Sequence, residues 1–195
     1  WVIPLALYLA TFILVFDSRW PLERWLRPGW ALLLAAACLV LGRSFAERFA
    51  PWPMIAAFNG MVFFGCLGIH GYLHALRPDP AHLTRYYFYM ALGGMIGGLV
   101  VGLVAPVLYP RPYEMGVALA LAGFLGFLWI RSHQSRFQAL WALLAVATLV
   151  VGVRDILRVV RRPGLFMRDY FGVIRVIQNP GYRMMHHGSI VHGTM

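Results

Sequence analysis

Two histidines, His70 and His74, lie four residues apart in an apolar stretch and are the first candidates for chemistry. On a helix this spacing places both imidazoles on one face, where they could share a metal ion. Either could instead be an axial ligand to a haem in a larger assembly. A structural role at a membrane interface is the more common explanation, and contact with a substrate is a third. The pair is therefore a possible ligand or metal site, although the sequence requires no cofactor there.

A second group lies near the end of the chain, where His186, His187 and His192 fall within seven residues. Three histidines this close could bind a metal ion. In a β-strand, however, the side chains of His187 and His192 would point to opposite faces. We therefore expect these two residues to line a substrate groove or to have a structural role. A serine between histidines does not make a catalytic triad.

The sequence contains no recognisable set of catalytic residues. All 17 basic residues are arginines, which excludes a lysine general base or a Schiff-base lysine. Cys38 and Cys66 both lie inside apolar runs, so we expect small buried side chains rather than a disulfide or a metal pair. Whether the chain belongs to an enzyme is left open by these residues.

The strongest local pattern is a run of glycines spaced four apart on one expected helix. Such spacing removes side chains from one stripe and lets a second helix approach closely, which predicts a helix-packing face. The members are Gly93, Gly94, Gly97, Gly98 and Gly102. A phosphate-binding loop is excluded, because no Lys-Ser/Thr pair follows and the segment is apolar.

The composition determines the kind of element that carries these residues. Of 195 residues, 61% are hydrophobic and 12% are charged, whereas soluble domains carry about 25% charged residues. Disordered proteins, coiled coils and ordinary soluble enzymes are therefore excluded. We expect an all-α integral membrane bundle of about six transmembrane helices with a short C-terminal β-hairpin. The candidate spans are residues 1–16, 30–41, 52–76, 86–109, 115–130 and 137–153.

The character of the chain changes after the last span. Residues 170–177 are β-branched and aromatic, which favours a strand, and Asn179-Pro180-Gly181 is a turn signal. Residues 182–185 and 189–192 can return as the second strand. We therefore expect a transmembrane helical domain over 1–162 and the truncated start of a soluble β-hairpin segment over 163–195.

The net charge of +10 predicts partners of a particular kind. In a membrane protein a basic balance is typical of loops that face anionic lipid. No basic run with interleaved aromatics indicates a nucleic-acid surface. We expect the partners to be the lipid bilayer and further helices, either of the same polypeptide or of another membrane protein. The arginine count weakly favours a cytoplasmic C-terminal tail.

Several segments resemble a bacterial membrane family known as spermidine-synthase-like, or fused transporter/spermidine-synthase, proteins. The matching segments are residues 3–12 (IPLALYLATF), 70–78 (HGYLHALRP), the glycine run 92–98, and the tail segments 170–176 (YFGVIRV) and 187–193 (HGSIVHG). They occur in the same order over nearly the whole chain. The chain is thus identified as similar to the membrane portion of this family plus the start of its soluble domain.

The resemblance implies a location in the bacterial inner membrane and a function. In that family a helical membrane part precedes an aminopropyltransferase-like domain, which transfers an aminopropyl group to a polyamine. The catalytic motifs of that domain would lie beyond Met195, so the expected role of this chain is to anchor or gate the domain. Two other functions remain open. One is a non-catalytic subunit that packs against a larger membrane complex. The other is half of a transporter, which predicts a polar cavity near Asn59 and His70.

Overall fold

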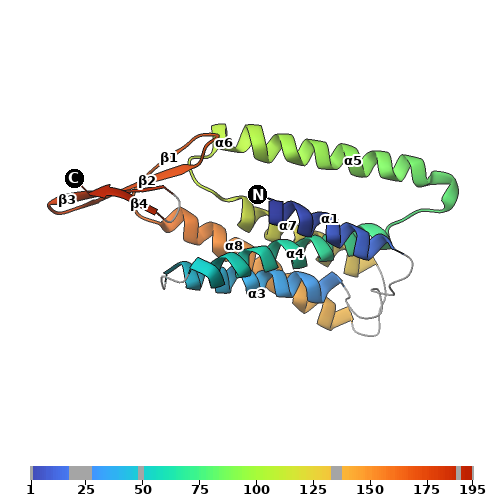
Figure 1. Cartoon of the computed structure of the whole chain (residues 1–195). Helices are drawn as coiled ribbons and strands as arrows, with labels where there is room; N and C mark the ends of the chain where they lie inside the picture. Colours follow the sequence, from blue (N-terminus) through green and yellow to red (C-terminus); the bar gives the residue numbers. More distant parts are fainter. Residues whose placement is uncertain (1, 18–27, 48–50, 133–137, 188–189, 195) are drawn as a thin grey trace. The chain divides into compact units, whose positions relative to one another are not determined.

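The structure is a computed structural model that describes residues 2–17, 28–47, 51–132, 138–187 and 190–194. Helices form most of it, and a small sheet follows the last helix (Figure 1). The helices are α1 (Val2–Phe16), α3 (Pro28–Glu47), α4 (Pro51–Ala75), the 3₁₀ turn η1 (Pro80–His82), α5 (Leu83–Leu99), the π-helical segment η2 (Val100–Val104), α6 (Ala105–Leu108), α7 (Glu114–Ser132) and α8 (Gln138–Arg161). The strands are β1 (Leu165–Arg168), β2 (Val173–Asn179), β3 (Tyr182–His187) and β4 (Ile190–Thr194).

Among the described residues, three helical segments are long and apolar enough to cross a membrane: Trp52–Ala75, Pro80–Leu108 and Gln138–Arg161. The expectation of six such spans is therefore wrong. The other three apolar helices are short, and α1, with 15 residues, is about 22 Å long. A bilayer core is about 30 Å thick, so α1 does not reach across it unaided.

The chain divides into two compact units. The first contains Trp1–Arg77 and Gly116–Arg154, and the second contains Pro78–Met115 and Asp155–Met195. Consequently α1, α3, α4 and most of α7 and α8 belong to the first unit. The sheet, α5 and the last turns of α8 belong to the second unit.

The first unit has a small apolar centre where its helices meet. Ala35 and Leu39 of α3 and Leu119 of α7 form its buried apolar centre. Phe58, Met61 and Phe64 of α4 and Val151 of α8 pack around that centre.

The closest helix contact in this unit joins α7 to α8. A Cβ atom at Gly123 would lie 2.5 Å from the backbone nitrogen of Leu149, and one at Gly152 would meet the backbone of Ala120. Neither contact can be relieved by moving a flexible side chain. Close approach through glycine thus occurs at a helix pair that the sequence pattern did not single out.

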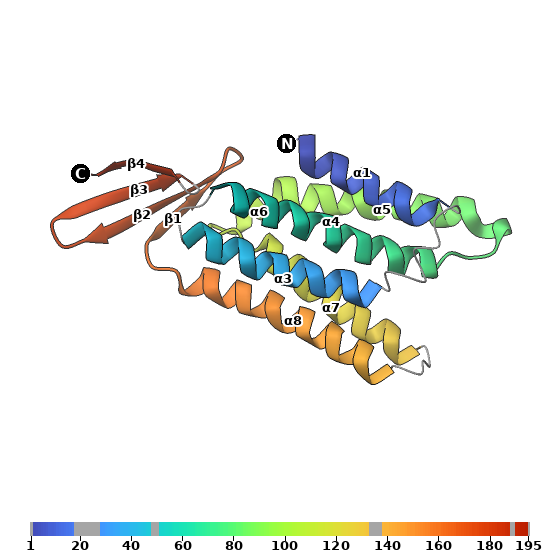
Figure 2. The same cartoon turned by 60° about the horizontal axis from the view of Figure 1, so that its bottom comes forward.

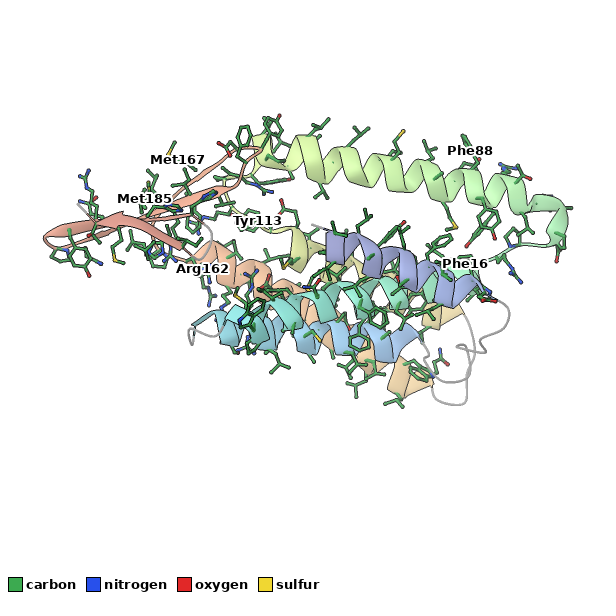
Figure 3. The ribbon with its side chains drawn as sticks, in the orientation of Figure 1. Phe16, Phe88, Tyr113, Arg162, Met167 and Met185 are labelled. Carbon is green, nitrogen blue, oxygen red and sulfur yellow. The ribbon has the colours of Figure 1, made fainter. Side chains whose placement is uncertain are left out.

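The glycine stripe of α5 has a different environment in the second unit. A Cβ atom at any of the five stripe glycines would meet nothing within 4 Å among the described residues. Large apolar side chains of α5 are also exposed, among them Phe88, which is labelled in Figure 3. The helix-packing partner of this stripe stays a prediction.

Helix α5 continues through the π segment into α6. The amide of Ala105 donates to the carbonyl of Val100, five residues back, directly before Pro106. A proline has no N–H group to donate, so the helix adjusts its hydrogen bonding at this point. Residues 80–108 nevertheless form one continuous apolar helical segment.

The sheet contains four antiparallel strands in the order β1-β2-β3-β4 (Figure 2). The predicted hairpin corresponds to β2 and β3, with Asn179 paired to Tyr182 across a turn. Gly181 has φ +93° and follows a proline, as in a type II turn. A hairpin alone is therefore an incomplete description, because β1 adds to one edge and β4 to the other.

Candidate functional site

A densely bonded polar site lies in the second unit, where the turn between α6 and α7 meets the end of α8. The guanidinium of Arg111 donates from Nη1 to the carbonyls of Val159, Val160 and Arg162, at 2.6, 2.8 and 3.0 Å. The last carbonyls of a helix lack partners within the helix and carry partial negative charge. Arg111 therefore caps α8 from a turn almost fifty residues earlier in the chain.

Arg111 also contacts the first strand. Its guanidinium carbon lies 4.3 Å from the centre of the Phe166 ring, and that of Arg175 lies 5.8 Å from the same ring. Arg175 donates from Nε to the carbonyl of Pro163 at 2.9 Å. Burial lowers the pKa of Arg175, and the charge of Arg111 lowers this pKa further. The aromatic ring and the carbonyl oxygens thus offset the repulsion between two neighbouring cations.

A third arginine connects β1 to the same turn. Arg168 forms an ion pair with Glu114 at the start of α7, and its Nη1 donates to the carbonyl of Arg111 at 3.3 Å. We call Arg111, Arg168 and Arg175, with Glu114 and Phe166, the arginine cluster. It joins the α6–α7 turn, the end of α8 and the first two strands at one point, so its chemistry is positioning rather than catalysis.

Sequence analysis did not identify this cluster. The contacts of Arg111 and Arg168 join residues 48 to 57 positions apart, and no local pattern carries such information. The available signal was the Pro110-Arg111-Pro112 turn, in which a lone arginine is held between two prolines. Prolines restrict the backbone and so fix the direction in which the side chain leaves it.

The first unit places the two candidate histidines of α4 against α1. His70 is 4% exposed, and its Nδ1 lies 3.2 Å from Oγ1 of the fully buried Thr11. The Thr11 hydroxyl donates to the carbonyl of Tyr8 at 2.8 Å. Since a hydroxyl has one hydrogen, we infer that Thr11 accepts from His70 and that Nδ1 carries the proton.

Aromatic side chains of α1 enclose this face of α4. The rings of Tyr8 and Phe12 contact His70 edge-on at 5.2 and 5.3 Å, and Phe16 contacts His74 at 5.4 Å. Both imidazoles therefore face one helix, as their spacing predicts. Among the described residues no three His, Cys, Asp or Glu side chains are grouped as metal ligands. The packing favours a structural role for His70, in which it holds α1 against α4.

This arrangement predicts the effect of removing the Thr11 hydroxyl. Thr11→Val keeps the volume but leaves the buried N–H of His70 without its acceptor, so we expect a loss of about 1–3 kcal/mol in the free energy of unfolding. Thermal unfolding of the detergent-solubilised protein measures this loss. Thr11→Ser retains the hydroxyl and should unfold close to the wild type. Equal stability of the Val and Ser variants would contradict the hydrogen bond.

The histidines of the sheet are arranged differently from the expectation. The register between β3 and β4 shifts at Met185/His186, which leaves His192 as an extra residue in β4. His187 pairs with Ile190, and paired residues share a face of the sheet, as do residues two apart in one strand, so the rings of His187 and His192 lie on one face, 5.7 Å apart, and not on opposite faces. Gly188 and Ser189 lie outside the described residues. The groove role of the two histidines stays a prediction.

No protein-family model, curated protein or solved structure matches this chain. The resemblance to spermidine-synthase-like membrane proteins therefore rests on the sequence segments alone.

Proposed function

We propose that this chain is the membrane-embedded portion of a spermidine-synthase-like protein, located in the bacterial inner membrane. In this proposal its helices anchor an aminopropyltransferase-like domain, and the sheet forms the connection to that domain. The observation that carries the proposal is the arginine cluster. It attaches the sheet to the last turn of α8 and to the turn after α6, all within the second unit, so the sheet is bonded to the point where α8 ends.

The distribution of aromatic side chains supports a transmembrane position for α5. Tyrosines and tryptophans are enriched where membrane helices leave the hydrocarbon core. Tyr86 and Tyr87 contact each other near the start of α5, and Tyr109 contacts Tyr113 just after α6. The 24 residues from Tyr86 to Tyr109 correspond to about 36 Å of helix, enough to cross a bilayer core about 30 Å thick.

The anchoring function is tested on the natural gene product purified from its own membranes. We expect an intact mass well above the 22.0 kDa of this chain and retention in the membrane pellet after alkaline carbonate washing. We also expect aminopropyl transfer from decarboxylated S-adenosylmethionine to a polyamine acceptor. A natural product of 22.0 kDa with no transferase activity would refute the proposal.

The second candidate function is a non-catalytic subunit of a larger membrane complex, and the open glycine stripe of α5 favours it. In that case the natural product would be about the size of this chain. It would also co-purify in mild detergent with a membrane partner that Gly97→Leu removes.

A further inference from the structure

Two aromatic side chains in the turn between β1 and β2 are exposed to solvent. Tyr170 is 63% exposed and Phe171 is 91% exposed. Aromatic side chains exposed to water at a turn lower the solubility of a protein. They are therefore typical of a surface that contacts a membrane or another apolar partner. We call residues 169–172 the hairpin tip.

The hairpin tip has a defined conformation. Oδ1 of Asp169 accepts from the amides of Phe171 and Gly172, at 2.8 and 3.0 Å, and the Asp169 amide donates to the carbonyl of Gly172 at 3.1 Å. An aspartate that bonds to the backbone two residues ahead stabilises a turn. The two aromatic side chains are therefore presented by an ordered turn.

The same turn is held close to the end of two long apolar helices. Arg168, the residue directly before the tip, pairs with Glu114 and donates to the carbonyl of Arg111. Three residues separate the last residue of α8, Arg161, from the first of β1, Leu165, so these two residues lie at most about 14 Å apart. The headgroup layer on each side of a bilayer core is about 5–8 Å thick. If α8 crosses the membrane and ends at the edge of the hydrocarbon core, β1 begins within this layer or just outside it.

The composition around the tip suits a lipid interface. Tyr109 and Tyr113 lie in the segment that the arginine cluster joins to β1. The β1 side chains on the face away from the cluster, Leu165 and Met167, are 66% and 60% exposed. Leu165 pairs with Val176, and Val176 pairs with Met185, so Met185 lies in the same row across the sheet as Leu165. Figure 3 shows Met167 and Met185 projecting from the sheet. Aromatic and apolar side chains in such a position partition into the boundary between headgroups and acyl chains.

The charge of this part of the chain indicates which lipids it favours. Residues 158–195 contain six arginines and one aspartate. Cationic segments next to a membrane span are attracted to anionic headgroups. The combination of exposed aromatics, a short connection to α8 and excess positive charge favours anionic lipid over a protein partner.

We propose that the hairpin tip is an interfacial membrane anchor, in which Tyr170 and Phe171 insert into the headgroup layer of the anionic bilayer that α8 crosses. This inference rests on the proposed membrane function, because it assumes that α5 and α8 span lipid. Its consequence is a second attachment of the sheet to the membrane, in addition to α8. The sheet would then contact the bilayer surface through its tip, as well as being bonded to the end of α8 through the arginine cluster.

The test uses the whole chain in nanodiscs of phosphatidylcholine and phosphatidylglycerol, with Cys38 and Cys66 replaced by alanine. Single cysteines replace Phe171, Gln178 or Ile96 and carry an environment-sensitive fluorophore. Gln178 is an exposed position near the other end of β2 and serves as the matched control. Ile96 is 50% exposed in the middle of α5 and reports on the span itself. Lipids with a nitroxide on the headgroup or on the acyl chain quench nearby fluorophores.

We expect the headgroup nitroxide to quench the probe at position 171 strongly and the probe at 178 weakly, and the acyl-chain nitroxide to quench the probe at 96. Quenching at 171 no stronger than at 178, with position 96 still quenched, would overturn the hairpin-tip anchor and leave the membrane function standing. That outcome would include the case in which a protein covers the tip. Loss of quenching at position 96 would overturn both.

Discussion

Replacing Arg111 by alanine should release the sheet from the end of α8. The substitution removes the two N–H groups of Nη1, which three carbonyls at the end of α8 share, and the stack on Phe166. Charged hydrogen bonds contribute about 1.5–3 kcal/mol each but are not additive, and a cation–π contact adds about 0.5–2 kcal/mol. We therefore expect local opening of the junction to become more favourable by about 3 kcal/mol.

Hydrogen exchange in nanodiscs measures this opening directly. If the free energy of local opening falls by about 3 kcal/mol, the amides of β1 and β2 should exchange on the order of 100-fold faster than in the wild type. The matched control is Arg161→Ala, since Arg161 is an exposed arginine at the same helix end. Arg111→Lys keeps the charge but not the planar, multiple-donor guanidinium, so it should restore protection partly. Equal exchange in the Arg111→Ala and Arg161→Ala variants would contradict the role of the cluster.

Adding a methyl group where α7 meets α8 should have a comparable effect on the first unit. At Gly123 the new carbon would lie 2.5 Å from the Leu149 nitrogen and 2.7 Å from the Ala145 carbonyl oxygen. At Gly152 it would lie 2.7 Å from the carbonyl oxygen of Gly116. Because these are backbone atoms, the helices must separate, at a cost of about 3 kcal/mol for either Ala variant. The melting temperature in detergent should fall by roughly 5–10 °C.

Gly97→Ala is the matched control for these variants. It makes the same chemical change within a helix, but its new carbon meets nothing within 4 Å. Alanine is favoured over glycine in a helix by about 1 kcal/mol, so the melting temperature of the isolated chain should stay unchanged or rise. A loss at Gly97 as large as at Gly123 would show that the α5 stripe, and not the α7–α8 contact, holds the chain together.

Sequence reasoning predicted the elements that depend on local composition. The long apolar runs correspond to α4, α5 with its continuation, and α8, and the Asn179-Pro180-Gly181 turn joins two paired strands. It overestimated the number of spans, because an apolar run predicts burial but not helix length. It missed β1, since four residues carry little pattern and the strand exists through its pairing with β2.

The candidate site was harder to predict. His70 and His74 do share a face, as their spacing requires, but their surroundings come from Tyr8, Thr11 and Phe12 on another helix. The spacing of glycines four residues apart identified the stripe on α5. Such spacing does not indicate which pair of helices packs closely. The arginine cluster joins segments almost fifty residues apart. In each case the missing information is which residues from other segments lie nearby in the folded chain. The same residue type can occur in several environments, and the local sequence does not distinguish them.

Accessibility of single cysteines in sealed vesicles tests the transmembrane arrangement most directly. Asp79 precedes the apolar segment Pro80–Leu108, and the turn after that segment is bonded to the end of α8 near Arg161. We therefore predict that a membrane-impermeant maleimide labels Asp79→Cys and Arg161→Cys from opposite sides of the membrane, in a chain whose native cysteines are replaced by alanine. Labelling of both positions from the same side would contradict the account.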